Sequence, residues 1–261
     1  MVHENEVAKY QELRAIVARL RAPDGCPWDR EQTHASLRPY VIEEAYEVLA
    51  ALDEGDMRSL ADVLGDLLFQ VLIHAVIAEE AAEFSMSSIL GALADKLVRR
   101  HPHVFGEVHL ETANEVSAQW DELKRAERES VEETALAGIP KALPALSLSQ
   151  ALLRRAATAG FAWPDRRDVL EKITEELEEL AAARTKEEAT EEFGDLLLNL
   201  ANYASYLEID AEEALRLASR KFQRRFEAVE AQARLSKRLM TGMSREELLA
   251  LWTAAKANTE A

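Results

Sequence analysis

Paired carboxylates at helical spacing occur twice in the C-terminal half of the sequence. The segment EELEE contains Glu176 and Glu179, and the segment EEFGDLLLNL contains Glu192 and Asp195. Residues three apart lie on one face of a helix, with Cβ atoms about 5–6 Å apart, so the members of each pair project together. If the two helices pack antiparallel, all four carboxylates face one another.

Four facing carboxylates need a counter-charge, because like charges repel and burial raises that cost. Mg²⁺ prefers oxygen ligands at about 2.0–2.1 Å, and carboxylates on facing helices are a common way to supply them. A solvated helix surface does not explain why Asp195 lies within the apolar run FGDLLLNLANY. The sequence therefore predicts Glu176, Glu179, Glu192 and Asp195 as ligands of Mg²⁺, with Mn²⁺ as an alternative.

Two other interpretations of these acids were weighed. A glutamate-rich helix such as EELEELAAARTKEE is, taken alone, typical of a solvated surface or an interaction scaffold. A ferritin-like di-iron centre needs two E-x-x-H motifs, and the chain has one, from Glu31 to His34. Oxygen donors favour a hard divalent ion over iron.

Basic and aromatic residues follow the acids in the sequence. Lys221 and Arg225 are four apart and share a helix face, with Arg224 beside them, and Trp252 precedes Lys256 by four residues. Taken singly these are ordinary surface charges and a core tryptophan. Together they provide what a nucleoside polyphosphate needs, because cations and metal neutralise phosphate charge and a ring can stack on a base.

Composition restricts the class of protein. The chain has 261 residues and a formal net charge of −17, which disfavours a nucleic-acid binder with a basic face. A single cysteine, Cys26, suits a reducing cytosol, and the polar start MVHENEVAKY is unlike a signal peptide. The apolar run Leu67–Ala78 is interrupted by Gln70 and His74 and is expected to be too short for a bilayer. We expect a cytoplasmic protein with no membrane or nucleic-acid partner.

The periodicity predicts an all-α fold. Apolar residues recur at three- and four-residue spacing in five segments, and strand-like alternation is absent. These segments are Tyr10–Leu20, Val41–Leu52, Ile89–Val98, Leu170–Ala183 and Ala214–Phe226. Few Gly and Pro residues interrupt them, with 9 and 7 in the chain.

The order of landmarks indicates a tandem duplication. A helix followed by tryptophan, an acidic motif, GDLL, K-x-x-R-R and W-x-x-x-K occurs once in each half. The glycines of GDLL, Gly65 and Gly194, are expected to let a helix, ligand or phosphate approach the backbone. The segment LAGIPKALPAL holds two prolines, which predicts domains at 1–135 and 147–261 joined by a linker at 136–146.

The segment GCPWDREQTHASLRPYVIEEAYEV, together with LGDLLFQV, DKLVRRHPHVF and WDELK, closely resembles the MazG family. The resemblance covers essentially the whole chain. It implies an all-α tandem repeat of two MazG-like four-helix-type domains that form a homodimer. It also implies Mg²⁺-dependent hydrolysis of NTPs or dNTPs to the monophosphate and pyrophosphate. Family roles include house-cleaning of aberrant nucleotides and adjustment of a signalling nucleotide pool.

The family motif, E-E-x-x-E followed by E-x-x-D, fits the second half in full. The matching acids are Glu175, Glu176, Glu179, Glu192 and Asp195. The resemblance implies that triphosphate contacts come from Lys172, Lys221, Arg224 and Arg225, with Trp252 and Lys256 near the substrate. Either Glu175 or Glu192 would then act as the general base.

The first half fits the motif only in part. Glu43, Glu44, Glu47 and Asp66 are present, but Val63 occupies the position of the E-x-x-D glutamate. The adjacent Asp62 is about 100° around the helix and one methylene shorter. We therefore expect a catalytic C-terminal half and an N-terminal half that is structural or binds weakly.

Two alternatives to a general NTP pyrophosphohydrolase share this fold. One is a helical nucleotide-binding regulatory protein with little hydrolytic activity. The other is a narrow-specificity dNTP pyrophosphatase, acting for example on dUTP, dCTP or an oxidised nucleotide. The intact second set of acids argues against the first, and a substrate panel separates the second.

Overall fold

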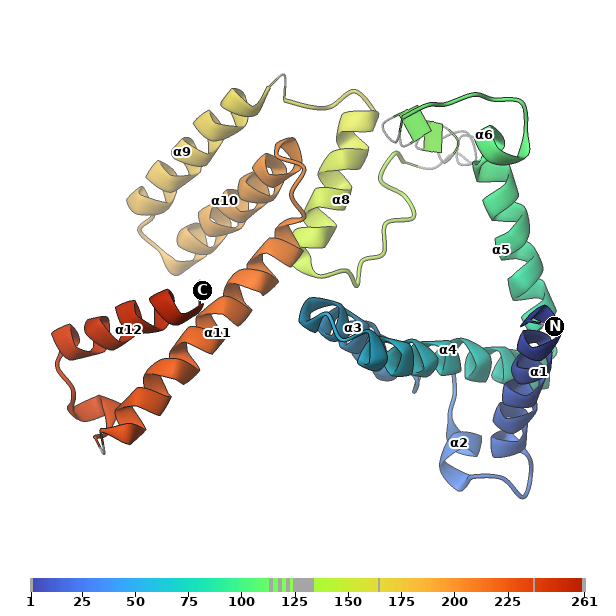
Figure 1. Cartoon of the computed structure of the whole chain (residues 1–261). Helices are drawn as coiled ribbons and strands as arrows, with labels where there is room; N and C mark the ends of the chain where they lie inside the picture. Colours follow the sequence, from blue (N-terminus) through green and yellow to red (C-terminus); the bar gives the residue numbers. More distant parts are fainter. Residues whose placement is uncertain are drawn as a thin grey trace. The chain divides into compact units, whose positions relative to one another are not determined.

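The computed structural model describes residues 2–112, 115–116, 119–120, 123, 134–163, 165–236 and 238–259. Every regular element in these ranges is helical, so the prediction of an all-α fold is confirmed (Figure 1). Each of the five segments with helical periodicity lies within a helix, apart from Ala183, which caps one. Lys124, the last residue of the first W-x-x-x-K landmark, lies outside the described residues.

The chain divides into two compact units, Met1–Glu127 and Arg128–Ala261. The helices of the first unit are α1 (Val2–Arg21), α2 (Pro27–Glu31), α3 (Arg38–Glu54), α4 (Met57–Glu80), α5 (Met86–Arg100) and α6 (Pro102–Phe105). Those of the second are α8 (Ala145–Thr158), α9 (Arg166–Ala182), α10 (Lys186–Tyr206), α11 (Ala211–Leu235), the 3₁₀ turn η1 (Met240–Gly242) and α12 (Arg245–Thr259).

A tight turn joins α3 to α4 in the first unit. Gly55 ends α3 with φ +68°, a left-handed conformation that glycine adopts without strain. Asp56 then caps α4, because its side chain accepts hydrogen bonds from the backbone N–H groups of Arg58 and Ser59. The two helices fold back on each other as a hairpin, which sets the acids of α3 against those of α4.

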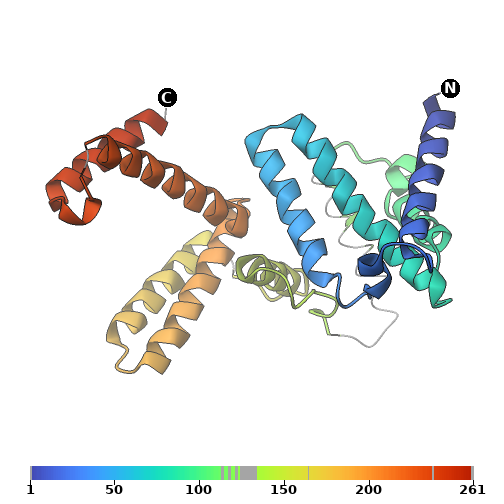
Figure 2. The same ribbon diagram turned by 90° about the horizontal axis from the view of Figure 1, so that it is seen from below.

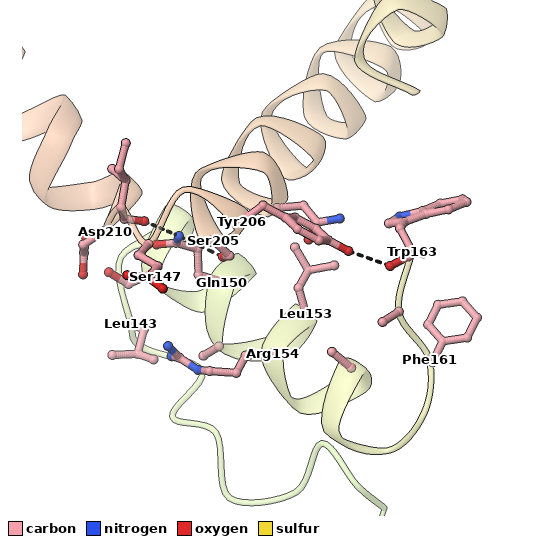
Figure 3. A pocket seen from close by; sticks show the side chains of 16 residues that line it. Leu143, Ser147, Gln150, Leu153, Arg154, Phe161, Trp163, Ser205, Tyr206 and Asp210 are labelled. Atoms are coloured by element: carbon pink, nitrogen blue, oxygen red, sulfur yellow. Dashed lines mark hydrogen bonds between the residues drawn. The ribbon is translucent and has the colours of Figure 1, made fainter. Parts of the chain in front are cut away.

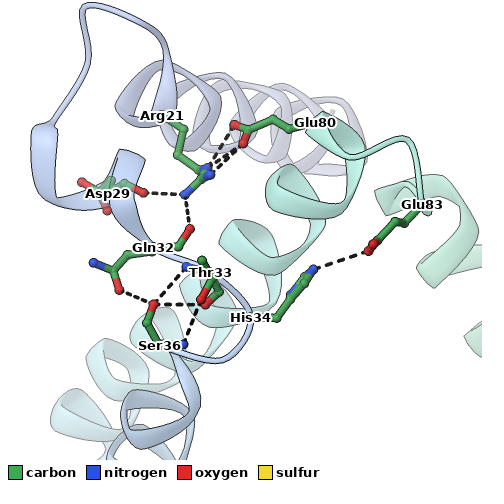
Figure 4. Close-up of polar contacts among 8 residues, drawn as sticks. All are labelled: Arg21, Asp29, Gln32, Thr33, His34, Ser36, Glu80 and Glu83. Atoms are coloured by element: carbon green, nitrogen blue, oxygen red, sulfur yellow. Dashed lines mark hydrogen bonds and ion pairs between the residues drawn. The ribbon is translucent and has the colours of Figure 1, made fainter.

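The core of the first unit forms where α1, α4 and α5 meet. Its buried side chains are Val17, Leu37, Leu72, Ile73, Ala75, Val76 and Met86. Arg21 links the elements at the edge of this core. Its buried guanidinium pairs with Glu80 at 2.7 Å and donates a hydrogen bond to Gln32 O at 3.0 Å (Figure 4). This network joins α1, α4 and the connection after α2.

Among the described helices, α4 is long and apolar enough to cross a membrane, judged by length and composition. The prediction that the apolar run Leu67–Ala78 is too short to span a bilayer is therefore wrong for the helix as a whole, because α4 extends beyond that run. The core helix of a soluble protein passes the same test, and α4 supplies Leu72, Ile73 and Val76 to the core. In this structure α4 is a packing helix of the first unit.

The second unit contains a similar hairpin, made by α9 and α10. Asp165 and Asp168 form a capping box at the start of α9, and Thr185 and Glu188 form another at the start of α10. Only residues 183–185 separate the two helices, so they pack side by side along their length (Figure 1). The short connection brings the C-terminal half of α9 against the N-terminal half of α10.

Gln150 connects α8 by hydrogen bonds to the end of α10, to the segment after it and to the start of α11. Its buried amide donates to Ser205 Oγ at 3.1 Å and to Ile209 O at 2.9 Å, and it accepts from Ala211 N at 2.9 Å. One side chain therefore satisfies the backbone at the start of α11.

We predict that Gln150→Leu lowers the free energy of unfolding by about 1–3 kcal/mol, because it leaves buried backbone donors and acceptors unpaired. Urea unfolding of the full chain, followed by circular dichroism, measures the change. The matched control is Gln223→Leu, since Gln223 is exposed and bonds only to Glu227 in the described contacts. That change should be within about 0.5 kcal/mol of wild type. Equal losses in both variants would contradict the role given to Gln150.

Candidate functional site

The α9–α10 hairpin brings three carboxylates together. Oxygen atoms of Glu176 and Glu179 on α9 and of Glu192 on α10 all lie within 4.8 Å of one another. Glu176 is buried, with 6% of its surface exposed. The spacing on each helix and the short connection between the helices produce this convergence.

Asp195, the fourth expected ligand, is exposed and lies outside this group of three. It is still close, because its charge contributes to the raised pKa of Glu192. The leucines beside it, including Leu197 and Leu200, are also exposed. Leu196 is buried, so the described residues form the apolar surroundings expected for Asp195 only in part.

Burial and charge repulsion both act on Glu192. Burial raises the pKa of this carboxyl, and the neighbouring charges of Glu179 and Glu176 raise it further. Lys172 pairs with acids of the motif on α9: its Nζ lies 2.8 Å from Glu175 and 3.4 Å from Glu176. The pKa of Lys172 is raised, mainly by its hydrogen bond with Glu175.

Asn199 is a polar contact that the sequence analysis missed. Its Nδ2 donates to Glu176 Oε1 at 3.3 Å and to the backbone oxygen of Asp195 at 3.1 Å. The signal was available, since Asn199 lies one helical turn after Asp195 and therefore on the same face. The amide holds one carboxylate oxygen of Glu176 in place.

The donor set fits a hard divalent cation. Three carboxylates converge and a single lysine offsets part of their charge, so net negative charge remains at the cluster. Oxygen-only donors suit Mg²⁺ or Mn²⁺ rather than a soft metal. The residues placed to hold such an ion are Glu176, Glu179 and Glu192, with Asp195 next to them.

The glycines before the GDLL aspartates leave open space. A Cβ atom built on Gly65 or Gly194 would meet no atom within 4 Å, apart from the local backbone of its own helix. Among the described residues, no neighbouring helix therefore lies in contact distance of either glycine's Cβ position. Room for a ligand is the expectation that remains.

The predicted cations are divided between two hairpins: Lys172 lies on α9 beside the acids, and the others lie on α11 and α12. Lys221 and Arg224 are exposed on α11, whereas Arg225 is buried at 8% exposure. The ring of Trp252 on α12 lies 5.4 Å from that of Phe222, and Lys256 follows one turn later. Thus α11 and α12 gather the basic residues and the tryptophan.

This second hairpin leads away from α9 and α10 (Figure 2). Among the described polar contacts, none joins Lys221 or Arg224 to Glu176, Glu179 or Glu192. In the described contacts Lys172 is the predicted cation that meets the acids, whereas Lys221 and Arg224 are not joined to them.

The first unit has a second acidic cluster. Oxygen atoms of Glu44 and Glu47 on α3 and of Asp66 on α4 lie within 4.8 Å of one another. Glu43 is not in this group. Burial raises the pKa of Glu44, and the charges of Asp66 and Glu47 add to the effect. The incomplete motif thus still gives three converging carboxylates.

A cavity of about 940 Å³ lies between α8, the end of α10 and the loop after α8 (Figure 3). Its wall includes Phe161, Trp163 and Tyr206, and the Tyr206 hydroxyl donates to Trp163 O at 2.6 Å. The cavity begins at Asn202, ten residues after Glu192 on α10, which is about 15 Å along the helix. It contains none of the predicted site residues.

Comparison with known proteins matches both acidic hairpins to one family. The model of the MazG nucleotide pyrophosphohydrolase domain matches residues 32–105 and again residues 166–230. The first match contains α3 and α4, and the second contains α9 and α10. The repeat inferred from the order of landmarks is therefore found independently.

Several curated proteins are similar over nearly the whole chain. A nucleoside triphosphate pyrophosphohydrolase/pyrophosphatase MazG of Thermotoga maritima is 40% identical over 251 residues, covering 96% of this chain and 97% of that protein. A nucleoside triphosphate pyrophosphohydrolase of Escherichia coli is 42% identical over 251 residues, covering 94% and 95%. Protein YabN of Bacillus subtilis, described as uncharacterized, is 42% identical over 95% of this chain and 52% of its own length.

We predict that the acids of the second unit destabilise the metal-free fold as pH rises. A raised carboxyl pKa means that folded protein binds the Glu192 proton more tightly than unfolded chain does. The free energy of unfolding therefore falls as pH rises from 4.5, the ordinary value, through the raised pKa. In EDTA, Glu192→Gln should melt above wild type, by a margin that grows as pH rises from about 4.5 through the raised pKa of Glu192.

Thermal melts of both proteins across this pH range measure that margin. His74 has a lowered pKa, which makes stability rise with pH over its own range, but it is present in both proteins and cancels in the difference. Saturating Mg²⁺ should reverse the order, because only wild type keeps the full site. A margin independent of pH would contradict the repulsion inferred here.

Proposed function

The chain belongs to the MazG family of nucleotide pyrophosphohydrolases, and on that basis we propose that it hydrolyses nucleoside triphosphates to the monophosphate and pyrophosphate. The observation that carries this proposal is the convergence of Glu176, Glu179 and Glu192 within 4.8 Å. Carboxylates held at this distance match the need of a triphosphate for bound divalent cations.

We assign catalysis to the C-terminal half. Its cluster includes Glu192, whereas the corresponding position in the N-terminal half is Val63. A valine cannot ligate a metal or accept a proton. The N-terminal half therefore lacks one of the groups that the reaction uses.

The carboxylates have two tasks in this proposal. Glu176, Glu179, Glu192 and Asp195 would hold Mg²⁺, or Mn²⁺. Bound there, the metal would lower the pKa of a coordinated water and neutralise phosphate charge. A second task is proton transfer, because the water that attacks the α-phosphorus must lose a proton as the bond to the leaving pyrophosphate breaks.

Glu192 and Glu175 are the candidate general bases. The raised pKa of Glu192 brings it toward the working pH, which favours proton acceptance. Glu175 is engaged by Lys172 at 2.8 Å, so it is better suited to orienting that lysine. We therefore rank Glu192 first. When a triphosphate binds, Lys172 would leave Glu175 and pair with the negatively charged phosphates.

The remaining substrate contacts come from the α11–α12 hairpin. Lys221 and Arg224 are exposed there and would hold the outer phosphates, with Arg225 and Lys256 adding positive charge. Trp252 would pack against the base.

We propose that the protein acts as a homodimer. Large apolar side chains are exposed on the helices that carry the site, including Phe193, Leu200 and Phe222. Contact between two copies would bury such exposed apolar side chains. In a symmetric dimer, the α11–α12 hairpin of one copy can cover the acids of the other, which joins the two halves of the site.

We infer the location and role of the protein from its proposed substrate and its composition. Free nucleoside triphosphates and a single unpaired cysteine, Cys26, are consistent with a cytoplasmic enzyme that removes aberrant nucleotides. A net charge of −17 disfavours nucleic acid as a partner.

We predict Mg²⁺-dependent release of pyrophosphate, with little orthophosphate, from a panel of eight NTPs and dNTPs. Glu192→Gln should lower turnover by about 100-fold or more, because it removes a ligand and the proposed base. Glu178→Gln is the matched control, since it removes the same charge from an exposed position on α9 outside the cluster.

Residual activity tests the assignment of halves. If both halves were catalytic, Glu192→Gln would keep about half of the wild-type rate. Orthophosphate as the main product would contradict the reaction itself, and activity confined to one nucleotide would favour the narrow-specificity alternative.

We also predict complementation between two inactive variants. Lys221→Ala and Glu192→Gln damage different hairpins, so a mixed dimer contains one site with intact acids and an intact lysine. Subunit exchange of equal amounts should restore about a quarter of the wild-type rate, because half of the dimers are mixed and each has one complete site. No recovery, with mixed dimers present by mass spectrometry, would place both hairpins of a site in one chain.

A further inference from the structure

Two histidines that are far apart in the sequence share a hydrogen bond in the first unit. His34 lies in the connection between α2 and α3, and His74 lies on α4 between the buried residues Ile73 and Ala75. Their Nδ1 atoms are 2.7 Å apart, and the two ring planes differ by 3°. This separation is shorter than ring stacking allows, so the imidazoles meet edge to edge with one proton between the two nitrogens.

A shared proton requires that at least one of the two rings is neutral. An imidazolium has N–H groups at both nitrogens and can only donate, whereas a neutral ring has one donor and one acceptor. The hydrogen bond therefore exists in the neutral pair, and it still exists after one proton has been added. It cannot exist when both rings are charged, because two N–H groups and two positive charges would then face each other.

The surroundings decide which ring takes the first proton. The Nε2 atom of His34 is buried, has no hydrogen-bond partner among the described residues, and lies 3.9 Å from the carboxylate of Glu83 (Figure 4). A proton on this nitrogen faces the negative charge of Glu83 and leaves the Nδ1 contact intact. Burial lowers the pKa of His74, and the charge of His34 lowers it further. His34 is therefore the ring that becomes charged first.

The other charged groups on the neighbouring elements are carboxylates and arginines. They are Glu83 after α4, the ion pairs Arg21–Glu80 and Arg14–Glu79 between α1 and α4, Asp29 on α2 and Arg38 at the start of α3. In general carboxylates ionise near pH 4 and arginines stay charged, whereas imidazole titrates near pH 6.5, each value being approximate (about one unit). The charge that changes here in the histidine range is therefore that of the two imidazoles.

We propose that His34 and His74 form a pH-sensitive latch that holds the connection between α2 and α3 against α4. The latch is closed when the pair carries no added proton or one, and it opens when both imidazoles are charged. Leu37 ends this connection and is fully buried in the core, so an open latch loosens the segment that anchors the start of α3. The latch belongs to the first unit and does not depend on hydrolysis in the second.

The direction of the pH effect follows from the lowered pKa of His74. The unfolded chain binds this proton more tightly than the folded unit does, so the histidine pair stabilises the closed segment above pH 6.5, the ordinary value for histidine. That stabilisation is lost as the pH falls from 6.5 through the lowered pKa. Acid therefore opens the latch, and at neutral pH it stays closed.

Titration of the full chain by NMR tests the proton accounting. In protein labelled with ¹⁵N at histidine, the ring-nitrogen shifts of the six histidines report which nitrogens carry a proton. We expect His34 to take up its proton before His74, and the Nδ1 signals of both rings to change when His74 does. Two rings that titrate without affecting each other would overturn the proposal.

Hydrogen exchange measures the opening itself. The amides of Thr33, Ser36 and Leu37 are hydrogen-bonded within the connection, so their exchange, corrected for the intrinsic effect of pH, reports its release. Between about pH 7.5 and about pH 5.5 we expect these amides to lose protection about tenfold, the effect of a pKa difference of about one unit.

Asparagine variants separate the latch from other effects of acid. His74→Asn should remove most of the pH dependence, because an amide can hydrogen-bond to His34 and does not titrate. His34→Asn should do the same from the other side of the pair. The matched control is His109→Asn, since His109 is exposed and outside the pair, and its exchange should follow wild type.

Two exchange results would contradict the latch. One is wild-type protection that does not change over this pH range, and the other is an equal loss in His74→Asn and His34→Asn. Circular dichroism establishes that each variant is folded, and the wild-type measurements decide the question even where a variant is not. Pyrophosphate release is measured separately, so failure of the proposed hydrolysis leaves this result interpretable.

Discussion

Repulsion between carboxylates on facing helices is the constraint on which this structure depends. The three-residue connection between α9 and α10 forces Glu176 and Glu179 against Glu192, within 4.8 Å. Packing of the hairpin favours this approach, and electrostatics opposes it, as the raised pKa of Glu192 indicates. A fold that accepts such a cost retains a strong attraction for a small multivalent cation. Hydrolysis of a phosphate anhydride requires such a cation, because the cation neutralises phosphate charge.

The two hairpins meet the same constraint by different means. Each places an amide one turn after the GDLL aspartate, and each amide bonds to the first glutamate of the pair. In the second unit a lysine also shares the charge. The first unit has Tyr40 and Val63 at the two diverging positions, so it keeps the acids without the added base or the neutralising lysine. The repeat thus carries two clusters of three carboxylates that differ in their neighbouring residues.

The placement of the acids and of most predicted cations on different hairpins is the observation behind the proposed dimer. The acids lie on α9 and α10, and Lys221, Arg224 and Trp252 lie on the α11–α12 hairpin that leads away from them (Figure 2). Exposed apolar side chains such as Phe193 and Phe222 line the same helices. Burial of those side chains between two copies would supply the free energy that brings a cationic hairpin close to a carboxylate cluster.

The sequence alone determined the helices, the repeat and the identity of the acids. Helical periodicity is local, and carboxylates three apart must share a face, so the cluster of Glu176, Glu179 and Glu192 followed from spacing once the hairpin was assumed. The amides of Gln70 and Asn199 were missed, although their one-turn spacing after an aspartate was visible. Tertiary structure decided the rest, because it depends on packing between helices. It left Asp195 exposed beside the cluster and buried Arg225. It placed Lys221 and Arg224 on another hairpin than the acids, and it brought Glu44, Glu47 and Asp66 together despite an incomplete motif.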